Sequence, residues 1–578
     1  MKRESSLGFV AANVGVLIGL TVGCAPSPAT SDQRPAGKGP MFAVRFGSGA
    51  FVEYNDSAST EKLDASLRDL EDGYWQLTVR VKNETIKELW FPWERGSNPL
   101  GASAEDDVLY FPHWMGQARL ADRAPRDKWE GRSYPGQCFT PLAVIADETR
   151  ARIVAAANWP PVKVFVAYSQ SRLGLRYDDF AKPGEQRTLT AWVAEANGQA
   201  AVGNHPWYSL LDRYKRFLNT NMQFEGLHPI AYPSWLRMIH GWQNVQLQNL
   251  KDHELNRVAE NWDRFKGVFP WLQMWGQMSD AFPTPGKETG CCMERSALHE
   301  RYRSPLPPLL ARVAREGHWG FYCRPRSPYG SLTANTATSG ADRGFLLEWV
   351  QRNRSEYGAN AFYIDVLGAE YFGDALAVAR MFGRELPMDS VVEMPMDVYP
   401  TAFLISGCLW GGSSCSTNPG QSCDDLQRRA ECVSFPAFGR YLLSDRIFFL
   451  GESNGDHAWW GTARGHEYWT ERQAFLLGAK LDAMRIAESD KTPDVLNRAV
   501  EMIVAERDRV GWWDREPEYL DRSGVYDVPP GVDVRRFRGR KGENLLVVDN
   551  WKRREGSFRF LGRAMPVPRQ ALAILVDP

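Results

Sequence analysis

The sequence lacks an excess of either charge: 69 Lys and Arg residues stand against 70 Asp and Glu, a net charge of −1 over 578 residues. Nucleic-acid binding depends on clustered basic residues that neutralise phosphates, so a nucleic-acid partner is not expected. Apolar residues make up 43% and charged residues 24% of the chain. These shares are close to soluble globular averages and exclude a disordered, collagen-like or polytopic membrane protein.

Motifs for nucleotide and metal binding are also missing. No G-x-G-x-x-G or G-x-x-x-x-G-K-[ST] turn follows a predicted strand. No H-E-x-x-H or C-x-x-C occurs, and the nine histidines are scattered. We therefore expect no cofactor and no metal, and a metal-dependent hydrolase is the weakest of the functions considered below.

The N-terminus has the pattern of a signal peptide over residues 1–23. Lys2 and Arg3 precede an uncharged stretch that is shorter than the roughly 20 residues needed to span a bilayer. The stretch ends in Leu20-Thr-Val-Gly-Cys24, which resembles the lipobox of bacterial lipoproteins. That resemblance implies lipidation of Cys24 and anchoring to the outer membrane of the cell envelope. Residues 24–40 then form a Pro/Ser-rich tether; ordinary cleavage without lipidation is the alternative.

The remaining cysteines fit an oxidising compartment, where disulfides form. They are Cys138, Cys291, Cys292, Cys323, Cys408, Cys415, Cys423 and Cys432. We expect disulfides among them, in a pairing that the sequence does not specify. The stretch from Cys408 to Cys432 is rich in Gly, Ser and Asn and is predicted to be a long loop.

Residues 41–205 are predicted to form a β-sandwich. Short alternating runs such as Trp75–Val81 and Val162–Tyr168 are separated by turn-forming clusters, without intervening helices. Gly198–Gly203 is predicted to be the loop that leaves this domain.

Residues 206–528 are predicted to form a (β/α)8 barrel, because short apolar strands alternate with helical segments. The predicted strands are Arg237–Trp242, Pro270–Gly276, Gly317–Arg324, Ala361–Asp365, Ser390–Met394 and Arg446–Gly451. The predicted helices are Trp207–Phe217, Leu306–Glu316, Arg343–Tyr357 and Glu467–Glu488. A doubly wound sheet is the alternative. Four further strand-like runs in residues 529–578 predict a small antiparallel β domain, so the chain is expected to be multidomain, part α/β and part all-β.

Reactive residues follow the predicted barrel strands where active sites of such barrels lie. Asp365 ends one strand, Glu393 ends a strand about one βα unit later, and Glu452 follows a third. Glycoside hydrolysis uses such a pair: one carboxylate attacks the anomeric carbon and a protonated carboxyl protonates the leaving oxygen. Helix capping for Asp365, and a buried ion pair for Glu393, are the structural alternatives.

Other polar and aromatic residues near predicted strand ends are candidates for substrate binding. They are Trp242, Trp275, Arg324, Arg326, Asp397, Tyr399, Asn454, Asp456, His457 and Trp459. Indole rings suit the apolar faces of sugars, and the polar groups suit their hydroxyls. Charge neutralisation of Asp365 is the alternative role for the two arginines.

Taken together, the sandwich, barrel and terminal β domain resemble glycoside hydrolases of the α-galactosidase and α-glucosidase clan and the endo-α-N-acetylgalactosaminidases. The run Phe362-Tyr-Ile-Asp365 resembles their fourth-strand nucleophile, and Glu393 matches the acid/base position of the second group. In the first group the acid comes from the sixth strand, which keeps Glu452 as the alternative. The run Glu393–Pro400 resembles an uncharacterised bacterial family of glycosidase-like barrels.

The resemblance implies a retaining glycoside hydrolase that acts on α-linked oligosaccharides or polysaccharides without a cofactor. The Lys-x-Asp strand of the galactosidases is absent, with Tyr363 at the position of the lysine, which argues against galactosidase specificity. A catalytically inert glycan-binding surface lipoprotein is the alternative function.

Overall fold

The computed structural model describes most of the chain from residue 41 onward. The described residues are 41–93, 100, 107–111, 117–120, 129–134, 138–147, 149–169, 172–197, 207–226, 233–246, 255–275, 304, 306–323, 340–364, 372–386, 391–395, 407–411, 441–442, 448–451, 480–485, 505, 507–508, 518–522, 525–529, 532–538, 542–550, 555–567 and 572–577. All of them belong to one compact unit, Gly37–Pro578. No helix among them has the length and apolar content that a membrane span requires.

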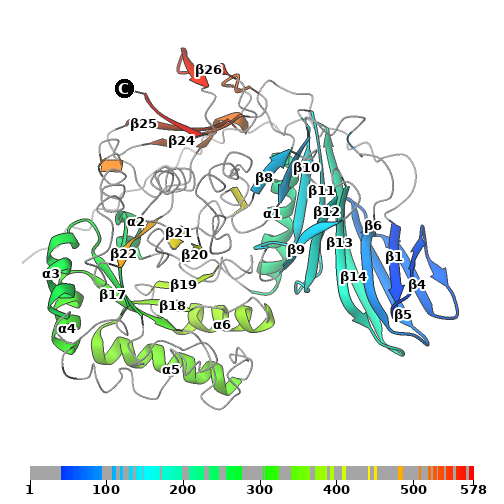
Figure 1. Ribbon diagram of the computed structural model, residues 1–578, viewed down its shortest axis with the longest axis horizontal. Coiled ribbons are helices and arrows are strands. Elements are labelled where there is room, and N and C mark those ends of the chain that lie inside the picture. The colour runs from blue at the N-terminus through cyan, green and yellow to red at the C-terminus, as the bar shows by residue number, and fades with distance from the viewer. Residues whose placement is uncertain are drawn as a thin grey trace, which may run out of the picture. The chain divides into compact units, whose positions relative to one another are not determined.

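Two antiparallel sheets face each other in the N-terminal part of the chain (Figure 1). The first contains, in spatial order, β2 (Phe51–Tyr54), β1 (Met41–Phe46), β6 (Ile86–Trp93), β13 (Arg172–Ala181), β12 (Val164–Ser169) and β9 (Glu130–Tyr134). The second contains β3 (Ala58–Ser59), β4 (Leu63–Asp69), β5 (Tyr74–Val81), β14 (Gln186–Asn197), β11 (Arg150–Ala156), β10 (Leu142–Ala146), β7 (Val108–Phe111) and β8 (Gln117–Leu120).

Alternating side chains of both sheets form one core, as the predicted sandwich requires. Leu77, Val79 and Val81 of β5 are buried together with Phe42 of β1 and Leu175 of β13. The predicted strands Trp75–Val81 and Val162–Tyr168 are observed as β5 and β12, the latter beginning two residues later than predicted.

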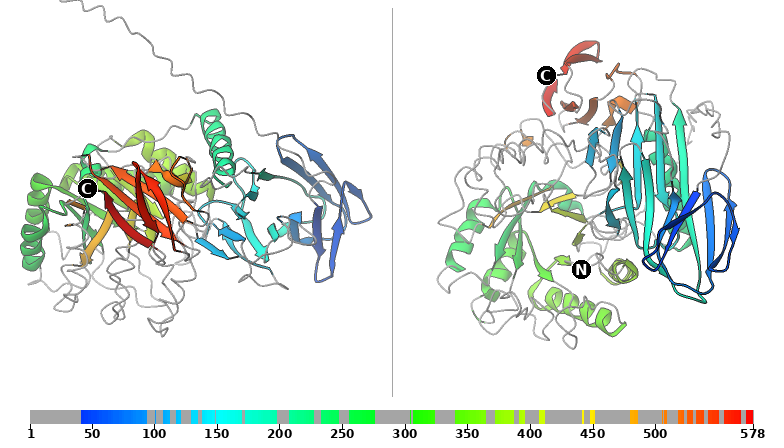
Figure 2. Two further views of the ribbon diagram at one scale, coloured as in Figure 1. Left: turned by 90° about the horizontal axis from the view of Figure 1, so that it is seen from above. Right: turned by 45° about the vertical axis from the view of Figure 1, so that its right-hand side comes forward.

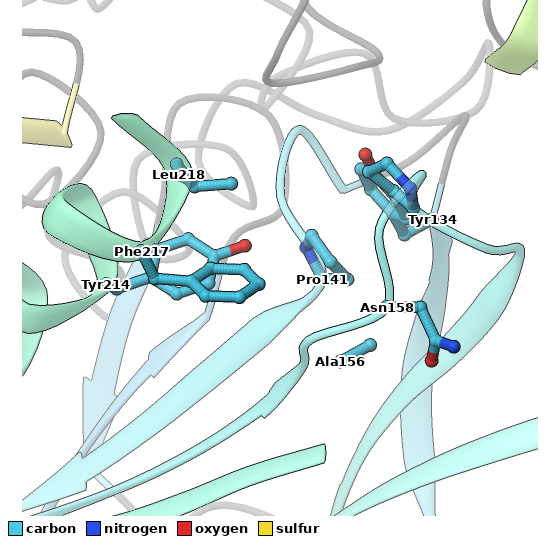
Figure 3. Close-up of a pocket in the computed structure, with 8 residues that line it drawn as sticks. Tyr134, Pro141, Ala156, Asn158, Tyr214, Phe217 and Leu218 are labelled. Atoms are coloured by element: carbon cyan, nitrogen blue, oxygen red, sulfur yellow. The ribbon is translucent and has the colours of Figure 1, made fainter. Parts of the chain in front are cut away.

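Helix α1 (Trp207–Phe224) packs against the second sheet. The Tyr214 hydroxyl lies 2.9 Å from Thr140 Oγ1, and its ring stacks on Trp192 at 6.4 Å. Between the helix and the sandwich lies a cavity of about 10 Å³, lined on the helix side by Tyr214, Phe217 and Leu218 (Figure 3). A cavity of this size holds at most about one water molecule, so it is a packing defect and not a sugar site.

Eight parallel strands form a closed barrel. They are β15 (Gly241–Gln246), β16 (Trp271–Trp275), β17 (His318–Cys323), β18 (Ala361–Ile364), β19 (Val391–Pro395), β20 (Gly407–Gly411), β21 (Phe448–Gly451) and β22 (Lys480–Arg485). Helices α3 (Leu255–Phe265), α4 (Leu306–Glu316), α5 (Gly340–Tyr357) and α6 (Phe372–Glu385) alternate with the first five strands (Figure 1). The predicted alternation of strand and helix is confirmed over this stretch.

Hydrogen bonds tie the described helices to the barrel and to one another. Trp319 of β17 donates its indole N–H to the carbonyl of Tyr357 at the end of α5, at 3.0 Å. Glu316 of α4 accepts hydrogen bonds from Lys266 and from Trp262 of α3, at 2.8 and 2.9 Å. These bonds, with the lysine bond the stronger cause, lower the pKa of Glu316 to about 2.

Three predictions for the barrel segment are wrong. Residues Lys480–Arg485 are not helical but form β22, which pairs with β15 and β21 and closes the barrel. Residues Gly407–Gly411 form β20, although the stretch from Cys408 was predicted to be loop. The strand predicted over Arg237–Trp242 begins only at Gly241, because helix α2 (Ser234–Met238) precedes it.

The C-terminal strands form a small antiparallel unit, coloured orange to red in Figure 2. One sheet has the order β23 (Glu518–Tyr519), β24 (Val532–Arg538), β25 (Asn544–Asn550) and β28 (Leu572–Asp577). Strands β26 (Gly556–Phe560) and β27 (Arg563–Val567) form a hairpin beside it. The four predicted strands of this segment are confirmed, and β27 was not predicted. The predicted domain boundaries at 205/206 and 528/529 stay predictions.

Cys138 is a free thiol, so the disulfide expectation is wrong at this position. Its side chain is fully buried with Sγ 3.8 Å from the carbonyl oxygen of Arg132, and burial raises the pKa of the thiol well above its ordinary value. The thiol therefore packs as a small apolar side chain. Cys323 and Cys408 lie in strands whose cysteine side chains are not described, and the other five lie outside the described residues.

A buried polar contact links α1 to the C-terminal sheet. The Tyr208 hydroxyl donates to Asp521 Oδ2 at 2.7 Å, and Asp521 Oδ1 accepts from the Val534 amide of β24 at 3.0 Å. Both side chains are buried, and burial raises the pKa of Tyr208, which keeps its hydroxyl protonated as a donor.

Tyr208→Phe should therefore lower the midpoint of chemical unfolding. The variant removes the donor to a buried carboxylate, which costs about 1–3 kcal/mol. Tyr526→Phe is the matched control, because the Tyr526 hydroxyl makes only a long, exposed contact of 3.5 Å with Glu518. Equal unfolding midpoints for the two variants would contradict the stabilising role of the Tyr208 contact.

Candidate active site

The two faces of the barrel sheet can be assigned from contacts with the helices. Trp319 bonds to the end of α5, and Phe362 of β18 contacts Trp349 of α5 at 6.5 Å between ring centroids. These positions therefore face the helical layer. Because successive strand residues point to opposite faces, Gly320 and Ala361 face the barrel interior. The register Leu272↔Trp319 and Gln273↔Gly320 puts Gln273 on the inner face as well.

Aromatic residues close the interior near the N-terminal ends of the first strands. Trp242 of β15 and Trp271 of β16 lie 5.3 Å apart between ring centroids. They pack in one apolar cluster with Ala361 and with Leu236 and Ile239, which lie in and just after α2. We call this cluster the barrel floor. It lies at the end of the barrel opposite the carboxyl ends of the strands.

The register relates the positions of the two predicted catalytic residues. Tyr363 of β18 is in register with Glu393 of β19, and Ala361 with Val391. Position 393 therefore lies on the same face of the sheet as position 361. Strand β18 ends at Ile364, so Asp365 is the next residue along the chain. Asp365 itself lies outside the described residues, and the side chain of Glu393 is not described.

Most other predicted site residues also fall outside the described part of the chain. Trp275 is the last residue of β16, in register with Gln246 of β15, but its side chain is not described. Cys24, Arg324, Arg326, Asp397, Tyr399, Glu452, Asn454, Asp456, His457 and Trp459 lie outside the described residues. Their roles stay predictions.

Trp242 is a correction. It is only 2% exposed and packs against Trp271 in the barrel floor. A sugar-stacking residue needs an open ring face, so Trp242 is a core residue and not a substrate-binding one. The sequence placed Trp242 at the end of a predicted strand, Arg237–Trp242. In the structure it lies at the start of β15 (Gly241–Gln246).

Two buried glutamines were missed at the sequence level. Gln243 and Gln273 are each 1% exposed, on neighbouring strands. Gln243 donates its Nε2 to the carbonyl of Phe269 at 2.9 Å, on the outer face. Gln273 lies on the inner face. The available signal was a polar residue in the middle of the apolar strand Trp271-Leu-Gln-Met-Trp275.

Within the described residues, no group of three or more His, Cys, Asp or Glu side chains is arranged to hold a metal ion. Of the inner-face residues whose side chains are described, Trp242 and Trp271 are packed in the barrel floor, and the carboxamide of Gln273 is a group able to hydrogen-bond a polyhydroxyl ligand.

No family model matches the sequence, and no curated protein matches it. Among solved structures, the chain resembles glycoside hydrolases. One is a GH31 family sulfoquinovosidase from E. rectale in complex with an aza-sugar inhibitor, at 10% identity over 82% of this chain and 80% of that chain, with a TM-score of 0.45. A second is the GH36 α-galactosidase AgaB from Geobacillus stearothermophilus, at 10% identity over 95% of this chain and 89% of that chain, with a TM-score of 0.46. A third is a xylosidase from Aspergillus niger, at 10% identity over 89% of this chain and 88% of that chain, with a TM-score of 0.45.

Proposed function

We propose that the protein is a retaining glycoside hydrolase of the bacterial cell envelope that cleaves α-linked glycans. Asp365 is the proposed nucleophile and Glu393 the proposed acid/base, with Glu452 as the alternative acid. The observation that carries the proposal is the register of a closed parallel barrel: Glu393 is level with Tyr363, two residues before Asp365, on the neighbouring strand.

The barrel geometry favours cooperation of these carboxylates. Parallel strands all end on one side, and adjacent strands lie about 4.8 Å apart. Asp365 is two residues, about 6.6 Å, further along its strand than the level of Glu393, so the two backbone positions are about 8 Å apart. Side chains that converge from this spacing can reach the separation of about 5–5.5 Å used by retaining enzymes. The floor at the opposite ends makes the carboxyl-end side the route for the glycan.

The proposed reaction has two steps. Asp365 attacks the anomeric carbon while the bond to the leaving oxygen breaks and Glu393 gives that oxygen its proton. Water then attacks the glycosyl-enzyme, Glu393 takes the proton of that water, and the bond to Asp365 breaks. The remaining predicted rim residues, from Trp275 to Trp459, hold the sugar in this orientation.

The test is a screen of released reducing sugars over bacterial, plant and mucin glycans, with the anomeric form of the product followed by proton NMR. Release of the α-anomer first from an α-linked substrate supports a retaining mechanism, and release of the β-anomer first from the same substrate contradicts retention. Affinity for a glycan without any turnover supports the inert binding protein instead. Loss of activity on chelation, restored by one divalent ion, contradicts the carboxylate mechanism.

The proposed anchor has its own test. Cys24→Ala should abolish metabolic labelling with a palmitate analogue and release the protein from the membrane fraction, because one residue carries the lipid. Cys138→Ala is the matched control, since Cys138 is buried and cannot be lipidated in the folded protein. Membrane association that is unchanged in Cys24→Ala would show that the protein is held in another way.

A further inference from the structure

A buried carboxamide inside the barrel has an unsatisfied oxygen. Gln273 is 1% exposed, and its Oε1 has no hydrogen-bond partner among the described residues. Leaving a buried polar atom unpaired costs about as much as a hydrogen bond and is rare in native proteins. Such an atom on the inner face of a barrel is able to accept a hydrogen bond from a bound molecule.

The strand positions level with Gln273 on β17 and β18 carry little or no side chain. In the register, Gln273 is level with Gly320 of β17, which is level with Ala361 of β18. Position 320 has no side chain and tolerates none, because the backbone of Ala361 packs so closely that a Cβ there would lie 1.8 Å from its carbonyl oxygen. Position 361 carries only a methyl group. Next to the carboxamide, two strands thus contribute almost no side-chain volume to the interior.

Gln273 also lies at the depth where a sugar would sit. Trp271 of the barrel floor is two residues before it on the same face of β16. The row that contains Glu393 is two residues beyond the row of Gln273 and Ala361. Two strand residues span about 6.6 Å. The carboxamide is therefore one step beyond Trp271, level with Ala361 at the upper edge of the floor, and one step below the proposed acid/base.

We infer that Gln273 is a substrate-binding residue, whose Oε1 accepts a hydrogen bond from a hydroxyl of the sugar that enters deepest into the barrel. The inference rests on the proposed function. A site built to accept a hydrogen bond from a hydroxyl rejects an analogue that lacks the hydroxyl, because the buried acceptor is then left unpaired. Gln273 thereby selects sugars with a free hydroxyl at the position that points to the floor.

The experiment compares Gln273→Met with Gln243→Met. Both replace a buried carboxamide on neighbouring strands by an apolar chain of similar length. Gln243 faces outward and its Nε2 bonds to Phe269, so its variant should lower the thermal unfolding midpoint and leave KM unchanged. Gln273→Met should have the opposite effects. KM for 4-nitrophenyl α-glycosides should rise about tenfold, which corresponds to the loss of one hydrogen bond to the substrate, and the unfolding midpoint should not fall.

A second readout does not depend on turnover. The iminosugars 1-deoxynojirimycin and 1-deoxygalactonojirimycin should raise the unfolding midpoint of the wild-type protein, and this shift should be lost in Gln273→Met. Wild-type KM and wild-type shifts in Gln273→Met overturn the inference. So does a lowered midpoint with unchanged KM, because Oε1 then binds a structural water.

The two readouts separate this inference from the proposed function. If the wild-type protein hydrolyses no glycoside but is stabilised by an iminosugar in a Gln273-dependent manner, the catalytic proposal is wrong and the binding role of Gln273 stands. If it hydrolyses glycosides equally well with Met at position 273, the catalytic proposal stands and the role of Gln273 is wrong. If neither turnover nor stabilisation occurs, both are overturned.

Discussion

Asp365→Asn is expected to lower kcat on every substrate by at least about a thousandfold, because the amide cannot form the glycosyl-enzyme and residues that act as one catalytic unit are each indispensable. Good leaving groups should not rescue the variant, since the missing step is bond formation to the anomeric carbon. Initial rates on a natural glycan and on an activated aryl glycoside measure the effect.

The control for this variant is Asp263→Asn. Asp263 lies on α3, where its carboxylate contacts Lys266 at 2.9 Å, and its hydrogen bonds to Arg312 and Lys266, the first the larger cause, lower the pKa of Asp263. Its variant changes the same functional group on the outer helical layer and should keep wild-type activity. Full activity of Asp365→Asn would mean that the nucleophile lies elsewhere in the chain.

Strands and helices with a strong local signal were predictable. Strands β16 to β19 are short apolar runs, and α4 has apolar residues at helical spacing, with Leu306, Leu310 and Val313 buried. These elements are specified by their own residues, whatever their neighbours are. The residues of β22, Lys-Leu-Asp-Ala-Met-Arg, carry no strand pattern. Their conformation is set by pairing with β15 and β21, which are distant in the sequence.

The candidate site was predictable in part for the same reason. Asp365 and Glu393 could be identified because each ends an apolar strand, which is a local feature. The burial of Trp242 depends on its packing with Trp271, and the unpaired oxygen of Gln273 depends on which residues the neighbouring strands bring level with it, such as Gly320. Both are properties of strand register and barrel closure, which the sequence pattern of a single strand does not contain.

The acid/base assignment makes the second large prediction. Glu393→Ala should slow hydrolysis of natural glycans by about 10²–10⁴-fold, because their alkoxide leaving groups need a proton. Aryl glycosides with acidic leaving groups should still form the glycosyl-enzyme at a substantial rate, since their departure needs little protonation. Azide should then restore turnover and yield a glycosyl azide, because this anion attacks the intermediate without help from a base.

The pH profile and two further variants decide between the possible acids. The alkaline limb of the wild-type profile, where the acid loses its proton, should disappear in the variant of the true acid. Glu316→Gln is the control, because Glu316 lies in the exposed ion-pair cluster of α4 and its pKa of about 2 keeps it ionised over the working range. If Glu393→Ala behaves as wild type while Glu452→Ala shows the leaving-group dependence and azide rescue, the proton is delivered from the segment that follows β21, and Glu393 is a structural residue of β19.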